Sequence, residues 1–168
     1  KHQVRGVVFY GVEDMGNRLG DPLLDVRPDE VLVLRGIGPL AAGMPEAGLI
    51  PIPKKLAAQG VRDMVRLSDG RMSGTAAGTI VLHISPEAGI GGPLSLVRNG
   101  DLIRLDVEQA SLELLVSSDE LELREKEQAH LDLPSVVKPR GYGWLHGQQV
   151  LQAPQGCDFR FLRGEPRA

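Results

Sequence analysis

The chain alternates short apolar runs with polar turns rich in Gly and Pro, a pattern that favours short strands over long helices. Residues 31–34 form a continuous apolar run, which indicates a buried strand. Asn99 and Gly100 separate two apolar runs and favour a tight hairpin turn between them. The predicted strands cover residues 7–10, 31–34, 61–67, 79–84, 94–97, 102–107 and 112–116.

Helix signals are fewer, and three short helices are predicted, over residues 54–59, 117–131 and 144–152. The second of them opens with Ser117 and Glu120 in capping-box spacing. Residues 11–28 carry turn signals and are predicted to be a loop. Because most predicted strands follow one another through turns, the pattern indicates a β-rich α/β fold. We expect a barrel or sandwich with peripheral helices, built as a single domain over residues 1–168.

Composition narrows the possible functions. A hydrophobic content of 42% argues against disorder, and a net charge of −3 gives no electrostatic case for a nucleic-acid partner. No apolar run is long enough to span a bilayer, and no signal peptide is expected. Cys157 is the single cysteine, so we expect a reducing, cytoplasmic location, and we expect Cys157 to be a packing residue. His83 lies in a predicted apolar strand and is expected to be a core residue.

Two segments could carry chemistry. Ser73 lies in the Gly-rich segment SDGRMSGT at residues 68–75, where small residues allow a ligand to approach the backbone closely. A serine hydroxyl becomes a useful base when nearby cations or donors stabilise its alkoxide. Glu46 lies 27 positions upstream, after Gly-Met-Pro, and is a possible ligand for a hard divalent ion. Taken separately, however, a Gly/Ser turn and a surface acid explain the two segments equally well.

Three further side chains flank the serine. Asp69 and Arg71 could orient Ser73 or bind a substrate carboxylate, for which the guanidinium has a suitable planar fork. A surface ion pair between Asp69 and Arg71 is the plainer alternative. Thr75 supplies a second hydroxyl close to Ser73. Substrate binding by Asp69, Arg71 and Thr75 is therefore a hypothesis.

Taken together, five ordered segments extend this interpretation. They are residues 43–46, 68–74, 83–88, 91–94 and 97–103, and their order and residue types resemble the C-terminal domain of the dihydroxy-acid dehydratase and phosphogluconate dehydratase family. The tail, through residues 140–142 and 156–159, is most similar to the aldonic sugar-acid dehydratase branch. The resemblance covers nearly the whole chain.

The resemblance implies a swivelling β/β/α domain with a partly closed β-barrel, packed on a larger N-terminal domain outside these 168 residues. It implies a hydro-lyase that converts a sugar acid into its 2-keto-3-deoxy acid. An iron–sulfur cluster (2Fe-2S or 4Fe-4S) would be held by the N-terminal domain, together with most ligands of a Mg²⁺ ion. By position, Ser73 matches the catalytic base and Glu46 matches a Mg²⁺ ligand.

The resemblance also implies a small hydroxy-acid substrate and a homo-oligomer for the intact enzyme. Other substrates within the family are a branched-chain dihydroxy acid and 6-phosphogluconate. A different class of function, a non-catalytic binding or assembly module, is suggested by the segment between Pro39 and Gly43, which has three residues where four are expected. Arg160 also stands where the family usually has an acid.

Overall fold

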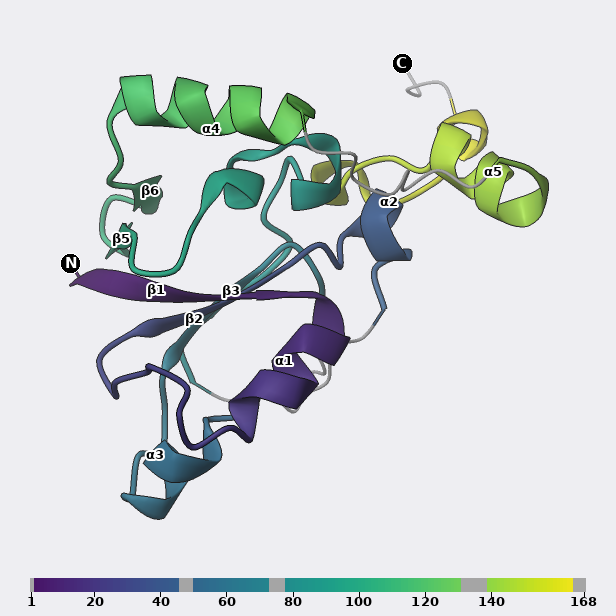
Figure 1. Cartoon of the computed structure of the whole chain (residues 1–168). Coiled ribbons are helices and arrows are strands. Elements are labelled where there is room, and N and C mark those ends of the chain that lie inside the picture. The colour runs from purple at the N-terminus through teal and green to yellow at the C-terminus, as the bar shows by residue number, and fades with distance from the viewer. Residues whose placement is uncertain (1, 46–49, 73–77, 131–138, 165–168) are drawn as a thin grey trace.

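The computed structural model of the protein describes residues 2–45, 50–72, 78–130 and 139–164. Within them, six strands form one sheet in the order β4-β3-β2-β1-β5-β6, which curls into a half-barrel with helices around it (Figure 1). The expectation of a β-rich α/β fold with a partly closed barrel is therefore confirmed. The strands are β1 (His2–Tyr10), β2 (Val31–Arg35), β3 (Val65–Ser68), β4 (Ile80–Val81), β5 (Leu102–Asp106) and β6 (Ser111–Leu114).

The strands do not simply follow one another through turns. β1, β2, β3 and β4 are parallel neighbours, and only the β1–β5 and β5–β6 pairs are antiparallel. In register, Val7 pairs with Leu32 and Val33 pairs with Leu67. Parallel neighbours need crossover connections, so the long segments between the first four strands are crossovers rather than hairpin turns.

β2 is buried on both faces of the sheet, which explains its continuous apolar run. Leu32 and Leu34 point into one apolar cluster, which also contains residues from α1 (Gly11–Leu19) and α3 (Lys54–Ala58). Val31 and Val33 point into a second cluster on the opposite face, with residues from η2 (Pro93–Leu96) and β5. The alternation of side chains along a strand therefore divides one apolar run between two cores.

Helix α1 occupies residues that the sequence predicted to be a loop, so that prediction is wrong. Gly11 and Gly16 weaken the local helix signal, but tertiary contacts outweigh it. Met15 and Leu19, four residues apart, are both buried against the sheet, and the Arg18 guanidinium lies 4.7 Å from the centre of the Phe9 ring.

The predicted hairpin strand at residues 94–97 is also wrong, because η2 (Pro93–Leu96) is a 3₁₀ helix. Its backbone carbonyls do not pair with a strand. Instead, the Arg35 guanidinium donates hydrogen bonds to the carbonyls of Leu94 (3.2 Å) and Val97 (2.8 Å), and also to that of Ser95. Hydrogen bonds from one arginine thus take the place of the strand pairing that was predicted for residues 94–97.

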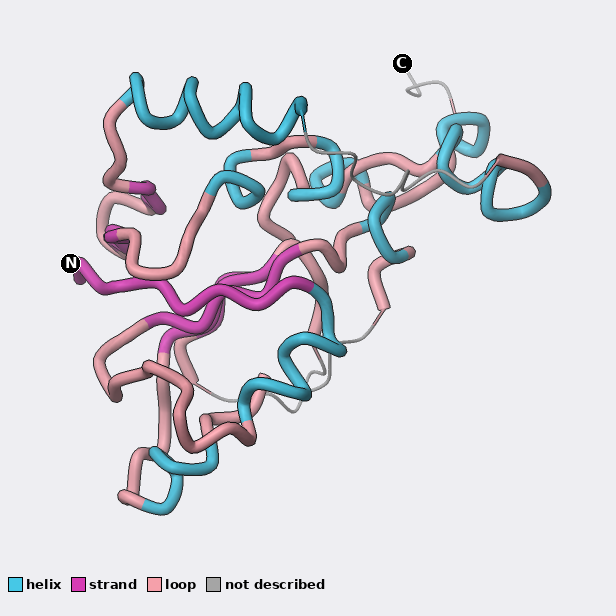
Figure 2. The backbone as a smooth tube through the Cα atoms, in the orientation of Figure 1, coloured by secondary structure: helices cyan, strands magenta, loops and turns pink. Residues whose placement is uncertain are grey.

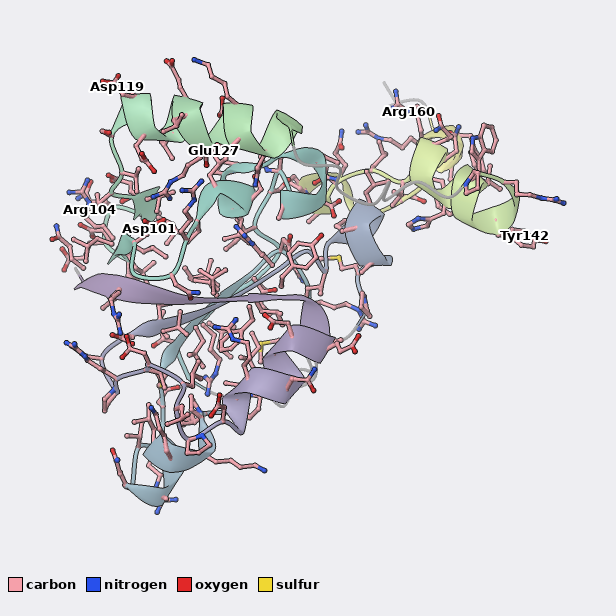
Figure 3. The ribbon with its side chains drawn as sticks, viewed as in Figure 1. Asp101, Arg104, Asp119, Glu127, Tyr142 and Arg160 are labelled. Atoms are coloured by element: carbon pink, nitrogen blue, oxygen red, sulfur yellow. The ribbon has the colours of Figure 1, made fainter. Side chains whose placement is uncertain are left out.

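Helix α4 (Ser118–His130) confirms the prediction for residues 117–131, including its cap, since the Ser117 hydroxyl accepts the amide of Glu120 at 3.3 Å. Arg124 is 7% exposed and anchors the helix on the rest of the fold. Its guanidinium donates to both carboxylate oxygens of Asp101, at 2.5 and 3.0 Å, and to the carbonyl of Leu96 at 2.9 Å. Figure 3 shows Asp101 below α4, and Glu127 on the helix itself.

The C-terminal part projects from the half-barrel, and most of it is helix or loop (Figure 2). It includes α5 (Gly141–Gln149) and η4 (Arg160–Leu162), and the labelled Tyr142 and Arg160 lie far from the sheet (Figure 3). Between them, η3 (Ala153–Gln155) follows Gln152, whose side chain is bonded to the buried Glu87. The remaining short elements are α2 (Pro39–Ala42) and η1 (Ala88–Ile90). Across the described ranges, every helix is too short or too polar to cross a membrane.

Candidate functional site

The described parts of the two segments that the sequence singled out, residues 43–45 and 68–72, lie at one edge of the sheet. The segment with residues 43–46 follows β2 and α2, and the segment with residues 68–75 follows β3. β2 and β3 are parallel neighbours, with Leu34 paired to Ser68, so their carboxyl ends lie side by side. Crevices beyond the carboxyl ends of parallel strands are common ligand-binding positions. The candidate site therefore lies at this edge.

Asp69 is fully buried directly after β3, and its carboxylate accepts three backbone amides. The amides belong to Gly36 (3.0 Å), Ile37 (3.2 Å) and Ala88 (3.0 Å). Burial raises the pKa of Asp69 above its ordinary value, although the three amides oppose the shift and the Glu87 charge adds to it. Asp69 therefore joins the loop after β2 to η1, and this geometry supports an orienting role rather than substrate contact.

Arg71 makes the direct link between the two segments. Its Nε donates to the backbone carbonyl of Met44 at 3.0 Å. In the chain, Arg71 lies two positions before Ser73, and Met44 lies two positions before Glu46. The tertiary structure thus brings together the described ends of the two segments that the resemblance connected.

A second buried carboxylate, Glu87, was not identified as a site residue from the sequence. It is 1% exposed and accepts the amides of Leu40 (2.7 Å) and Ala41 (2.9 Å) at the start of α2. Its Oε1 also accepts the side-chain amide of Gln152 at 2.7 Å. In the sequence, the one sign of its importance was that Glu87 lies in the ordered segment of residues 83–88.

These contacts surround an open cleft of about 450 Å³, lined by Gly43, Met44, Arg71, His83, Ala153, Gly156 and Cys157. The lining comes from the loop after α2, the loop after β3, the segment after β4 and the C-terminal region. Arg71 supplies a positive charge to the lining, whereas the C-terminal region contributes the small, uncharged residues Ala153, Gly156 and Cys157. Such a cleft suits a small anionic ligand.

Three of the lining residues have left-handed backbone conformations, although none of them is Gly. Their φ angles are 51° at Met44, 57° at His83 and 53° at Cys157. Backbone conformations of this kind are uncommon outside Gly and tend to gather at functional sites. They come from three separate parts of the chain and meet at one cleft, which supports a functional assignment for it.

His83 corrects one prediction from the sequence. It was expected to be a core residue of a strand, but β4 ends at Val81 and the His83 side chain is exposed in the cleft. Its backbone amide donates to the carbonyl of Gly70 at 3.1 Å, which turns the side chain outward beside the loop after β3.

Cys157 is half-buried, and burial is the main reason that the pKa of its thiol is raised. The thiol sulfur lies 3.1 Å from the sulfur of Met44, across the cleft from its own segment. A raised pKa leaves less thiolate at neutral pH, consistent with a packing residue rather than a nucleophile.

Of the five site residues expected from the sequence, Ser73, Glu46 and Thr75 lie outside the described residues. Asp69 and Arg71 are described, and both lie at the edge of the sheet where the cleft is found. Among the residues that the structure describes, no three His, Cys, Asp or Glu side chains form a group that could hold a metal ion. The described residues by themselves therefore do not fit either an iron–sulfur cluster or a complete Mg²⁺ site.

Comparison with protein-family models matches residues 1–157 to the dihydroxy-acid/6-phosphogluconate dehydratase C-terminal family. The chain belongs to this family, as the five ordered segments indicated. The family takes its name from dehydratases, which are hydro-lyases.

Individual relatives refine the comparison. A 6-deoxy-6-sulfo-D-gluconate dehydratase of Pseudomonas putida is 48% identical over 97% of this chain and 28% of its own length. An L-arabonate dehydratase of Azospirillum brasilense is 46% identical over 98% of this chain and 29% of its own length. A dihydroxy-acid dehydratase of Thermus thermophilus is 42% identical over 60% of this chain and 18% of its own length. The chain thus spans less than a third of the length of the relatives that it matches.

Proposed function

We propose that this chain is the C-terminal domain, over residues 1–168, of an enzyme that dehydrates a sugar acid to its 2-keto-3-deoxy acid. The hydrogen bond from Arg71 to the carbonyl of Met44 carries the proposal, because it joins the loops that lead to Ser73 and Glu46. The substrate class rests on relatives named for 6-deoxy-6-sulfo-D-gluconate and L-arabonate, which match nearly the whole chain.

In this proposal Ser73 removes the proton from the carbon next to the substrate carboxylate. The hydroxyl on the following carbon leaves as water, and the resulting enol becomes a 2-keto acid, so the overall reaction loses one molecule of water. Arg71 binds the carboxylate, since a guanidinium matches its planar geometry. Thr75 binds a substrate hydroxyl, and Asp69 orients the loop that carries Ser73 through its three amide contacts.

We further propose that the enzyme uses an iron–sulfur cluster and Mg²⁺, held mainly by an N-terminal part outside this chain, with Glu46 as one Mg²⁺ ligand. A single cysteine cannot hold an iron–sulfur cluster by itself, so the proposal places the cluster ligands outside this chain. When bound, such metals act as Lewis acids on substrate oxygens. A cytoplasmic location and a homo-oligomeric intact enzyme complete the proposal.

The decisive experiment replaces the proposed base in the intact enzyme. We expect Ser73→Ala to abolish formation of 2-keto-3-deoxy acid from L-arabonate, measured anaerobically, while the melting temperature stays unchanged. Ser111→Ala, at the start of β6, is the matched control and should keep full activity. Retained turnover in Ser73→Ala would show that another group acts as the base.

Substrate preference separates the proposal from its alternatives. We expect kcat/KM for a sugar acid to exceed the values for a branched-chain dihydroxy acid and for 6-phosphogluconate. A preference for either of these would move the chain to another branch of the family. An intact enzyme that turns over none of the three would favour a binding or assembly module.

A further inference from the structure

The loop of residues 150–159 leaves α5 and turns back toward the half-barrel, and we call it the C-terminal loop. Val150 and Phe159 form an isolated antiparallel bridge at its base, and the amide of Leu151 donates to the carbonyl of Asp158 at 2.9 Å. Inside it, Gln152 and Gln155 form a capping box around η3. The C-terminal loop is thus a closed unit with its own hydrogen bonds.

Two hydrogen bonds between Gln152 and Glu87 attach this unit to the rest of the fold, beside the contact between the sulfurs of Cys157 and Met44. The side-chain oxygen Oε1 of Gln152 accepts the backbone amide of Glu87 at 2.9 Å, and the side-chain Nε2 of Gln152 donates to Glu87 Oε1 at 2.7 Å. Both ends of one side-chain amide are therefore used, which fixes the position and the rotation of the side chain. Because Glu87 is 1% exposed, loss of these bonds would leave its buried backbone amide without an acceptor and its carboxylate, among the described residues, with only the amides of Leu40 and Ala41.

The same carboxylate fixes the opposite wall of the cleft. Glu87 accepts the amides of Leu40 and Ala41 at the start of α2, and α2 leads directly to Gly43 and Met44. One buried carboxylate is thus shared by the C-terminal loop and by the segment that continues toward the proposed metal ligand. The contact between the sulfurs of Cys157 and Met44 lies between the same two walls.

We propose that Glu87 and Gln152 are positioning residues that hold the C-terminal loop as one wall of the substrate cleft. The loop contributes Ala153, Gly156 and Cys157 to the lining. These side chains are small and none is an acid or base at neutral pH, so the loop shapes the cleft and supplies no proton transfer. Its loss should weaken substrate binding and leave the chemical step intact, which is the signature of uniform binding. The inference takes its substrate class from the proposed function.

The kinetic test uses the intact enzyme with L-arabonate as the probe. Gln152→Ala removes both bonds to Glu87, and we expect KM to rise about tenfold with kcat changed by less than about twofold. The matched control is Gln148→Ala, an exposed residue of the same type on α5, which should change neither constant. A fall in kcat with KM unchanged would overturn the proposal, because it would assign the pair to the chemical step.

A second readout needs no turnover. In the native enzyme, alkylation of Cys157 by iodoacetamide is followed by peptide mass spectrometry, which resolves this thiol from any others. We expect labelling to be about tenfold faster in Gln152→Ala than in the wild type and in Gln148→Ala, because the loop leaves Met44. Equal labelling in all three proteins would overturn the proposal, even if the enzyme proved inactive on every sugar acid.

The wild-type protein gives a third readout that requires no variant to fold. Saturating L-arabonate should slow labelling of Cys157, because the ligand fills the cleft that this residue lines. If the enzyme dehydrates L-arabonate but L-arabonate does not change the labelling rate of Cys157, the substrate binds outside this cleft and the proposal is overturned. If the enzyme does not dehydrate L-arabonate but Cys157 is labelled faster in Gln152→Ala, the assigned substrate is wrong and the attachment of the loop by Gln152 is supported.

Discussion

Single residues at this site hold loops by accepting backbone amides. Asp69 and Glu87 are both buried carboxylates, and each binds backbone groups from segments distant in the chain. Charge-assisted hydrogen bonds of this kind are stronger than neutral ones, and leaving such a group unpaired in a buried position is costly. The precision of the cleft therefore depends on residues that do not line it.

Close packing around Glu87 gives the first prediction at this scale. A Cβ atom at Gly38 would lie 2.6 Å from the Cβ of Glu87 and 2.7 Å from its carboxyl carbon, closer than van der Waals contact permits. We expect Gly38→Ala to lower the free energy of unfolding by about 1–3 kcal/mol, since overpacking forces neighbours to shift. Urea unfolding of the 168-residue chain measures the change.

A second Gly in the chain provides the matched control. Gly16 lies inside α1, and a Cβ there would meet no other atom within 4 Å. Gly16→Ala should stabilise the chain by up to about 1 kcal/mol, because Ala favours the helix. Equal effects at Gly38 and Gly16 would contradict the packing argument.

The raised pKa of Asp69 predicts a pH dependence of stability. Its folded-state pKa lies above its unfolded-state value, so the folded state binds the proton more tightly. The stabilisation is fully present below the unfolded-state pKa and is lost as the pH rises through the folded-state pKa. The free energy of unfolding of the wild type should therefore fall, relative to Asp69→Asn, from acidic toward neutral pH. Urea unfolding across this range tests it, and a difference that is independent of pH would refute it.

At the scale of elements, parallel pairing of β2 and β3 decides where the site forms. The two strands end side by side, so the loops that follow them meet, and the hydrogen bond from Arg71 to Met44 fixes the meeting point. An antiparallel arrangement would have placed the two loops at opposite edges of the sheet.

Helix α4 is attached through one arginine, which yields a prediction for this element. Arg124 is buried and bound to both carboxylate oxygens of Asp101, and these contacts raise its pKa further. We expect Arg124→Ala to lower the free energy of unfolding by about 3–5 kcal/mol, because it leaves a nearly buried carboxylate unpaired.

The control on the same helix is Lys126→Ala, at an exposed position, which should change the free energy by less than about 0.5 kcal/mol. Urea unfolding, followed by circular dichroism, measures both variants. A small effect of Arg124→Ala would mean that apolar contacts, rather than the ion pair, hold α4 in place.

At the scale of the whole molecule, the chain matches less than a third of the length of its sugar-acid dehydratase relatives. We predict that the 168-residue chain by itself is colourless and does not dehydrate L-arabonate, because the proposed cluster ligands lie outside it. Iron analysis and an anaerobic product assay test this prediction. Iron bound at about one equivalent would contradict it.

Much of the fold could be predicted where the signal is local. The buried run of β2, the helix after Pro53 and the cap of α4 at Ser117 are each confirmed. The predictions failed where a distant residue decides the structure. Residues 94–97 form a 3₁₀ helix because Arg35 binds their carbonyls, and α1 forms because Met15 and Leu19 pack on the sheet.

The candidate site divides in the same way. The sequence pointed to Asp69 and Arg71 by their place beside Ser73, but it gave Glu87 and Gln152 no role and placed His83 in the core. The bonds that define these roles join residues 65 positions apart for Glu87 and Gln152, and 33 apart for Asp69 and Gly36. Patterns of neighbouring residues carry no information about such pairs.

The sequence alone indicated the family, through its resemblance, together with the β-rich class and the segments proposed to carry the chemistry, because these depend on residues close together in the chain. Only the tertiary structure decided that the first four strands are parallel, that two buried carboxylates hold the loops, and that the C-terminal loop lines the cleft. These features arise from contacts between distant segments, whose free energy outweighs the local preferences that a sequence pattern records.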